Sequence, residues 1–69
     1  MQKVVIVIPT YNEAANVIPT TVELSKVFKR SVGYNLHILF VDDNSPDGTS
    51  KVIDGLIKKY PFVHILNNK

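Results

Sequence analysis

Three short apolar runs, at residues 4–8, 36–41 and 62–66, alternate with two longer stretches in which apolar residues recur every three or four positions. The first run reads VVIVI, and a β-branched run without polar alternation is typical of a strand buried on both faces of a parallel sheet. The spacing in the longer stretches is that of helices with one apolar face. Strand, helix, strand, helix, strand predicts an α/β fold in which crossover helices connect parallel strands.

The ends of the two helical stretches are marked by turn-forming residues. The first stretch starts near Ile18 and closes before Gly33, which places Pro19 in the first turn, where its missing N–H is harmless. The second stretch is preceded by Asp47 and Thr49, either of which could cap its start, and Pro61 stops it. Its apolar stripe consists of Val52, Ile53, Leu56, Ile57 and Tyr60.

Length and composition exclude several classes of protein. Sixty-nine residues suffice for at most one small domain, and a chain without cysteine has neither disulfides nor a thiolate metal site. The longest apolar run, residues 4–8, is too short to cross a bilayer, and no small-residue cleavage site of a secretory signal follows it. A net charge of +2 gives no argument for binding nucleic acid.

Polar segments follow the first two predicted strands, at residues 9–16 and 42–48. In a sheet of parallel strands these segments lie at the same edge, which is where α/β proteins bind ligands. Four carboxylates gather there: Glu13, Asp42, Asp43 and Asp47. Complementing a helix dipole accounts for Asp47, but it does not explain why two like charges, Asp42 and Asp43, are adjacent. The pair therefore indicates a ligand site.

Two nucleotide-binding classes and one signalling class share this architecture. The turn after the first strand, PTYNEAAN, has no glycine, which excludes a dinucleotide-binding motif, and the P-loop pattern is also absent. A phosphorelay receiver domain places an acidic pair at a strand end to hold magnesium. In receivers, however, the pair follows the first strand, whereas here it follows the second, and the third ends at Leu66 and Asn67 without an aspartate. The receiver stays an alternative.

Two motifs together resemble a known family. PTYNE at residues 9–13 and VDDNSPDGT at residues 41–49 are similar to the N-terminal signature of the family 2 glycosyltransferases of GT-A fold. The SPDGT ending most resembles dolichol-phosphate mannose synthases and their bacterial polyprenyl-phosphate relatives. The resemblance implies a Rossmann-like, three-layer, nucleotide-sugar-binding fold with a parallel sheet. Residues 1–69 would be its incomplete, nucleotide-binding N-terminal part.

The resemblance also implies which residues line the nucleotide-sugar pocket. Flat apolar side chains would face the base, and carboxylates would accept hydrogen bonds from base N–H or ribose hydroxyl groups. Asn12 and Asn16 are interpreted as turn and cap residues, and His37 and His64 as packed histidines without a catalytic role. No catalytic residue is expected in this segment. The residues expected to bind the nucleotide sugar are Pro9, Tyr11, Glu13, Val41, Asp42 and Asp43.

The implied activity is transfer of a hexose, specifically mannose from GDP-mannose, to dolichyl or polyprenyl phosphate. A UDP-sugar donor is the first alternative, the receiver domain is the second, and a fragment without activity is the third. The family uses a divalent cation, Mg²⁺ or Mn²⁺, held by an Asp-x-Asp motif that is expected beyond Lys69. Residues 1–69 alone are therefore expected to be inactive.

The predicted topology also bears on partners and location. If the strands lie in the order 3-2-1, two right-handed crossovers put both helices on one face and leave the other face bare. An exposed apolar face of that size is unusual in a soluble monomer. We therefore expect the rest of the same domain, or a second copy, to cover it. The resemblance implies a cytoplasmic enzyme that is peripheral to a membrane or anchored in it through other regions.

Overall fold

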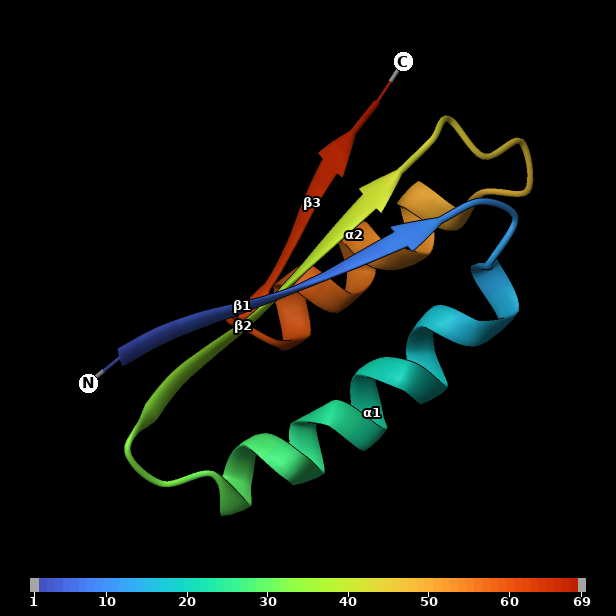
Figure 1. Ribbon diagram of the computed structural model, residues 1–69. Coiled ribbons are helices and arrows are strands. Elements are labelled where there is room, and N and C mark those ends of the chain that lie inside the picture. Colours follow the sequence, from blue (N-terminus) through green and yellow to red (C-terminus); the bar gives the residue numbers. More distant parts are fainter. Residues whose placement is uncertain (1, 69) are drawn as a thin grey trace.

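The computed structural model describes residues 2–68, which form three strands and two helices in the predicted order. The strands are β1 (Gln2–Thr10), β2 (Tyr34–Asp42) and β3 (Val63–Asn67), and the helices are α1 (Ala14–Arg30) and α2 (Thr49–Lys59). Both strand pairs are parallel, and the order in the sheet is β1-β2-β3 (Figure 1). The predicted α/β fold and its parallel sheet are confirmed.

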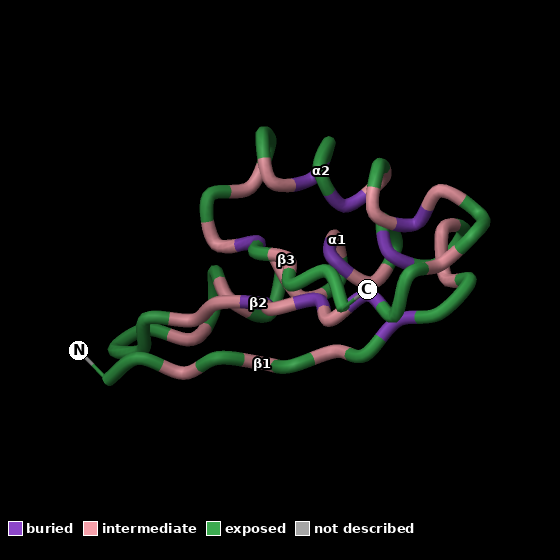
Figure 2. Tube along the Cα trace, turned by 90° about the horizontal axis from the view of Figure 1, so that it is seen from above, coloured by how far each residue is buried: buried purple, intermediate pink, exposed green. Residues whose placement is uncertain are grey.

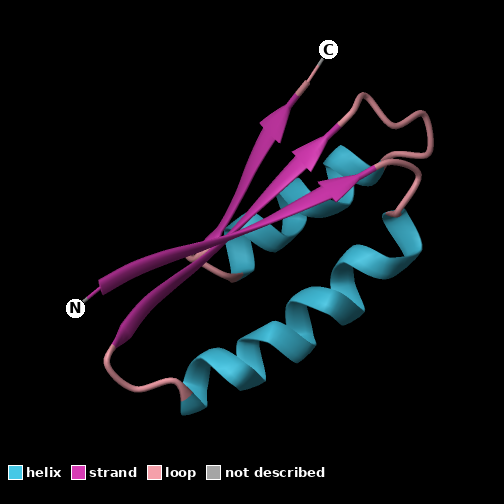
Figure 3. Ribbon diagram, viewed as in Figure 1, coloured by secondary structure: helices cyan, strands magenta, loops and turns pink. Residues whose placement is uncertain are grey.

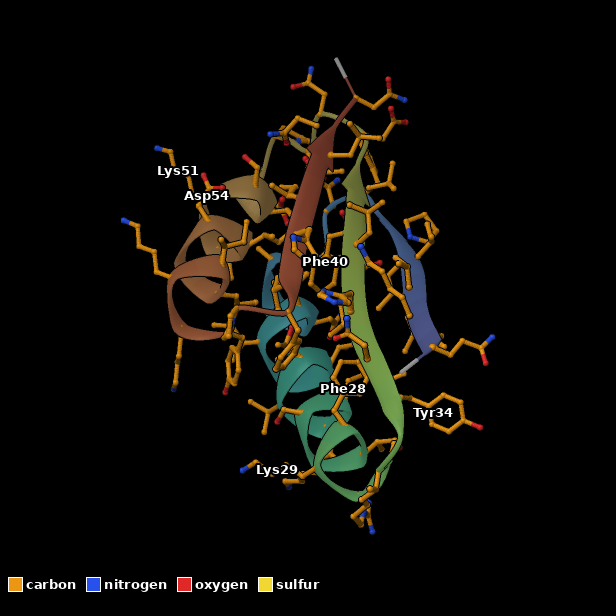
Figure 4. All side chains as sticks on the ribbon, turned by 90° about the vertical axis from the view of Figure 1, so that its left-hand side faces the viewer. Phe28, Lys29, Tyr34, Phe40, Lys51 and Asp54 are labelled. Atoms are coloured by element: carbon orange, nitrogen blue, oxygen red, sulfur yellow. The ribbon has the colours of Figure 1, made fainter. Side chains whose placement is uncertain are left out.

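Both helices pack on the same face of the sheet, as Figures 1 and 2 show. Alternate side chains of β2 and β3 point toward them, and Ile38, Phe40 and Val63 are almost completely buried. Phe40 lies at the centre of this layer (Figure 4). Helix residues complete the core from the other side: Val17, Ile53 and Leu56. The described residues thus form two layers, and burying one apolar face of each element against the other stabilises both.

The opposite face of the sheet carries no helix within residues 2–68 (Figure 2). Val5 and Val7 of β1 are 44% and 59% exposed, and Leu66 of β3 is 55% exposed. The predicted bare face is therefore present, because consecutive right-handed crossovers place both helices on one side. That the rest of the same domain, or a second copy, covers this face stays a prediction.

Helix α1 begins earlier than expected, at Ala14 rather than near Ile18, so Pro19 lies inside the helix and its predicted position in the first turn is wrong. The early start is explained by contacts from a distant loop. The N–H of Glu13 donates to Thr49 Oγ1 at 3.1 Å, and the N–H of Ala14 donates to Asp47 Oδ2 at 3.2 Å. These acceptors satisfy donors that a helix start leaves unpaired, and the exposed Pro19 loses only one helical bond.

Helix α2 begins at Thr49, directly after Gly48, whose φ of 83° is in the left-handed region that favours glycine. The N-cap residue is Gly48, so neither of the two expected residues holds the cap position. Asp47 Oδ1 nevertheless accepts the N–H of Thr49, the first residue of the helix, at 3.1 Å. The helix ends at Lys59, and Tyr60 follows it in extended conformation. Tyr60 was expected in the helical stripe, but it still packs against the core.

Candidate functional site

The ends of β1 and β2 lie side by side, because the register pairs Thr10 with Asp42. The strands fan apart toward these ends, and the loops 11–13 and 43–48 leave the sheet at the same edge (Figure 3). The end of β3 joins them, since the N–H of Asn68 donates to the carbonyl of Asp42 at 2.8 Å. The predicted clustering of both polar segments at one sheet edge is confirmed.

A hollow of about 410 Å³ lies between these strand ends. Five of the six predicted nucleotide-sugar residues line it, and the sixth, Asp42, is not among its lining residues. The structure thus brings together residues from both sequence motifs, while the identity of the ligand stays a prediction. The hollow is lined by Pro9, Thr10, Tyr11, Glu13, Val41, Asp43 and Asn68.

Asp42 is a buried anchor that joins the two loops. Its side chain points to the helix side of the sheet and is 1% exposed. Oδ1 accepts hydrogen bonds from Thr10 Oγ1 at 3.0 Å and Ser45 Oγ at 2.7 Å, and Oδ2 accepts the N–H of Ser45 at 3.1 Å. Burial raises the pKa of Asp42, but the hydrogen bonds donated by Ser45 and Thr10 outweigh this effect. The pKa of Asp42 therefore lies below its ordinary value of 3.8. Asp42 is therefore a charged, fully engaged carboxylate.

Asp43 has the opposite environment. It is exposed, lines the hollow, and uses its backbone N–H to bond the carbonyl of Thr10 at 3.1 Å. Within residues 2–68 no donor bonds its carboxylate, whereas Glu13 Oε2 already accepts from Asn16 Nδ2 at 2.7 Å. Asp42 is the last residue of β2, and Asp43 is the first residue after it. The adjacent carboxylates therefore have different environments: Asp42 holds the loops, and Asp43 presents its carboxylate to the hollow.

A second clamp holds the two helix starts together. Asp47 accepts the hydroxyl and N–H of Thr49 with one oxygen and the N–H of Ala14 with the other. These donors, the Thr49 hydroxyl foremost, hold the pKa of Asp47 below its usual 3.8, while slight desolvation opposes them. The N–H of Asn12 also donates to Ser45 Oγ at 3.0 Å. The two loops are thus fixed to each other before any ligand binds.

The two predicted turn and cap asparagines have different roles. Asn12 has a φ of 54°, a left-handed turn conformation that asparagine tolerates, so its predicted turn role is confirmed. Asn16 lies in the first turn of α1, where its side-chain amide donates to Glu13 Oε2, and within residues 2–68 its side-chain oxygen accepts no backbone N–H, so its predicted role as a turn or cap residue is wrong. Its position follows from the early start of the helix.

Two residues that line the hollow, Thr10 and Asn68, were not predicted from the sequence. Thr10 is 5% exposed and its hydroxyl meets Asp42 across the strand pair. Aligning the polar ends of the first two predicted strands would have placed the Thr10 hydroxyl opposite the Asp42 carboxylate. Asn68 carries no such signal, because its place depends on the register between β2 and β3.

His37 and His64 were interpreted as packed histidines, but the structure places them on the uncovered face, where His64 is exposed and His37 half-buried. They contact each other through ring nitrogens 2.9 Å apart. The interpretation of their packing is wrong because the strand period directs them away from the helices.

Cation ligands are sparse in the described part of the chain. Within residues 2–68 no three His, Cys, Asp or Glu side chains are grouped so that they could hold a metal ion. The hollow offers the carboxylates of Glu13 and Asp43, and a hard cation held by one or two carboxylates takes its remaining oxygen ligands from water and substrate phosphate. The described residues alone therefore do not make a complete cation site. In the same range no helix is both long and apolar enough to traverse a bilayer.

The fold and the hollow define an α/β protein with carboxylates and an aromatic side chain around a hollow at the ends of its first two strands. The profile of the family "Glycosyl transferase family 2" matches residues 5–69, nearly the whole chain. The chain belongs to glycosyl transferase family 2, and its β-α-β-α-β unit is a Rossmann-like portion of a GT-A fold. Membership in this family decides against the phosphorelay receiver.

Curated relatives have similar sequences. Dolichol-phosphate mannosyltransferase of Pyrococcus furiosus is 39% identical over 97% of this chain, and polyprenol monophosphomannose synthase of Mycolicibacterium smegmatis is 40% identical over 96%. Dolichol-phosphate mannosyltransferase of Saccharomyces cerevisiae is 33% identical over 88%. The aligned part spans only 18%, 23% and 23% of these three relatives, respectively. No solved structure matches the chain with significant similarity.

Proposed function

We propose that the chain is the nucleotide-binding part of a glycosyltransferase that moves mannose from GDP-mannose to a dolichyl or polyprenyl phosphate. The observation that carries the proposal is the hollow, because five residues from two separate family motifs line it together. The names of the three relatives support the mannosyl group and the lipid acceptor. A UDP-sugar is the alternative donor, since the lining residues alone do not distinguish the bases.

The side chains around the hollow suit the nucleoside half of such a donor. Tyr11 is 57% exposed, and with Pro9 it offers flat apolar surface against which a base can lie. The carboxylate of Asp43 can accept hydrogen bonds from base N–H or ribose hydroxyl groups, and such charge-assisted bonds are strong. The clamps at Asp42 and Asp47 hold these groups in place, so little ordering is needed when the ligand binds.

In the proposed reaction an oxygen of the lipid phosphate attacks the anomeric carbon of mannose. The bond from that carbon to the nucleoside diphosphate breaks, and GDP leaves with the electron pair. The pyrophosphate needs a positive counter-charge, which carboxylates cannot provide. We therefore include a divalent cation, Mg²⁺ or Mn²⁺, in the proposal, with ligands outside residues 1–69. The described residues contribute binding and orientation of the nucleoside.

The proposed location follows from the acceptor. A polyprenyl phosphate lies in a membrane, so the enzyme would work at the cytoplasmic surface of that membrane, through regions outside this chain. The chain itself contributes the donor side. Residues 1–69 would be an incomplete part of the catalytic domain.

The proposal predicts that the intact enzyme, incubated with radiolabelled GDP-mannose, Mn²⁺ and a polyprenyl phosphate, forms a mannosylated lipid, and that residues 1–69 alone form none. Parallel reactions with UDP-glucose separate the two donors. Product from GDP-mannose supports the proposal. Product from the UDP-sugar alone would show that the donor is a UDP-sugar and not GDP-mannose. If membrane preparations that contain the intact enzyme form glycolipid from neither donor, the proposed reaction is wrong.

A further inference from the structure

The hydroxyl of Ser45 joins the two loops whose side chains line the hollow. It donates to Asp42 Oδ1 at 2.7 Å and accepts the N–H of Asn12 at 3.0 Å. A charged carboxylate can only accept and a backbone N–H can only donate, so the direction of both bonds is fixed. Ser45 is half-buried and is not among the residues that line the hollow. An effect of Ser45 on a ligand in the hollow therefore passes through the residues that its hydroxyl holds.

Each loop turns sharply directly after a residue that lines the hollow. Asn12 follows Tyr11 and has a φ of 54°. Asn44 follows Asp43 and has a φ of 55°. Left-handed conformations are uncommon for residues other than glycine and persist where surrounding contacts hold them. Ser45 holds both turns, because its hydroxyl bonds Asn12 and its N–H, directly after Asn44, bonds the buried carboxylate at 3.1 Å.

The bond to Asn12 is the contact that holds the turn next to Tyr11. The following two N–H groups, of Glu13 and Ala14, donate instead to side chains at or next to the start of α2. Those two bonds fix the start of α1 without Ser45. Loss of the Ser45 hydroxyl would therefore free the turn and leave the helix in place.

We propose that Ser45 is a positioning residue, whose hydroxyl fixes the turn after Tyr11 and thereby the place of the Tyr11 ring at the hollow. The role rests on the proposed function, in which this ring lies against the base of the nucleotide sugar. Without the hydroxyl, Asn12 can leave its left-handed conformation, and Tyr11 moves with it. The loop must then be ordered again when the ligand binds, and this lowers the affinity.

Ser45→Ala removes the link between the loops and leaves the rest of the anchor intact. The carboxylate of Asp42 keeps the Thr10 hydroxyl at 3.0 Å and the N–H of residue 45 at 3.1 Å, and the exposed Asn12 N–H can bond water. We expect the affinity of the intact enzyme for GDP-mannose, measured by calorimetric titration, to fall about three- to tenfold. Ser31→Ala is the matched control, because Ser31 is also half-buried and its hydroxyl bonds a carbonyl of α1 at 2.9 Å, at the other end of that helix.

Two further variants separate positioning from a merely structural role. Ser45→Thr keeps the hydroxyl and should bind within about twofold of the wild type. In a double-mutant cycle, Ser45→Ala should cost less than about twofold when Tyr11 is already alanine, because the residue through which it acts is gone. Equal losses in Ser45→Ala and Ser45→Thr, equal losses with and without Tyr11, or wild-type affinity in Ser45→Ala would each overturn the proposal.

Hydrogen exchange of the ligand-free intact protein gives a readout that does not depend on the nucleotide. In peptides that cover residues 10–13 we expect faster exchange in Ser45→Ala than in the wild type or Ser31→Ala, because the Asn12 N–H loses its acceptor. Unchanged exchange would overturn the link between the loops, whichever ligand binds. Faster exchange in Ser45→Ala, with no binding of GDP-mannose or UDP-glucose to the wild type, would support the link and show that the proposed function is wrong.

Discussion

We expect Asp43→Asn to lower the affinity of the intact enzyme for the proposed nucleotide sugar by about 10- to 150-fold. The substitution keeps the shape of the side chain and removes its charge. Losing a charge-assisted hydrogen bond costs about 1.5–3 kcal/mol, and each 1.4 kcal/mol is a factor of ten in affinity. Because the Asp43 carboxylate is exposed and has no bonded donor within residues 2–68, the fold should not change. Calorimetric titration with GDP-mannose measures the loss.

Two control variants show whether Asp43 has been assigned correctly. Asp54→Asn removes an exposed carboxylate from the outer side of α2 and should bind like the wild type. Asp47→Asn loosens the clamp between the loops and should weaken binding less than Asp43→Asn, because Asp47 is not among the residues that line the hollow. Wild-type affinity in Asp43→Asn together with a large loss in Asp47→Asn would reverse the assignment of the loop.

Asp42→Ala destabilises the fold rather than weakening one contact with a ligand. The change leaves the hydroxyls of Thr10 and Ser45 and the N–H of Ser45 without their shared acceptor. Leaving several buried or half-buried donors unpaired lowers the free energy of unfolding by roughly 2–4 kcal/mol. Urea unfolding of the wild type and the variant at pH 7 measures the difference, and Asp54→Ala should change stability little.

The loss of stability in Asp42→Ala should be smaller at low pH than at pH 7. The folded pKa of Asp42 lies below the unfolded value of 3.8, so the unfolded chain binds the proton more readily. The contribution of the carboxylate is thus fully present above about pH 5 and is lost as pH falls through the folded pKa. The stability gap between wild type and Asp42→Ala should narrow below about pH 4. A gap that stays constant down to pH 2 would contradict the role of the charged carboxylate.

Much of the fold follows from the sequence because its signals are local and periodic. The run VVIVI predicts a strand, and the three- and four-residue spacing of Val52, Leu56 and their neighbours predicts a helix; the structure has both. The handedness of crossovers then fixes which face the helices cover. The hollow also follows, since Pro9 and Val41 lie opposite each other, one residue before the ends of adjacent parallel strands.

The features that could not be predicted depend on contacts between distant segments. Helix α1 starts at Ala14 because Asp47, from the other loop, accepts its N–H, and no signal near Ala14 shows this. The different environments of Asp42 and Asp43 were expected from strand geometry, but the partner hydroxyl of Thr10 depends on the register. The contact between His37 and His64 likewise requires the pairing of β2 with β3.

Photolabelling with 8-azido-GDP-mannose tests most directly whether the hollow at the ends of β1 and β2 holds the nucleoside. The intact enzyme is irradiated with the probe and digested with trypsin, and the labelled peptides are identified by mass spectrometry. We expect the label in the tryptic peptides that cover residues 4–26 and 31–51, which contain Tyr11 and Asp43, and we expect excess GDP-mannose to suppress it. Competable label confined to other peptides would show that the nucleoside binds elsewhere and that the central claim is wrong.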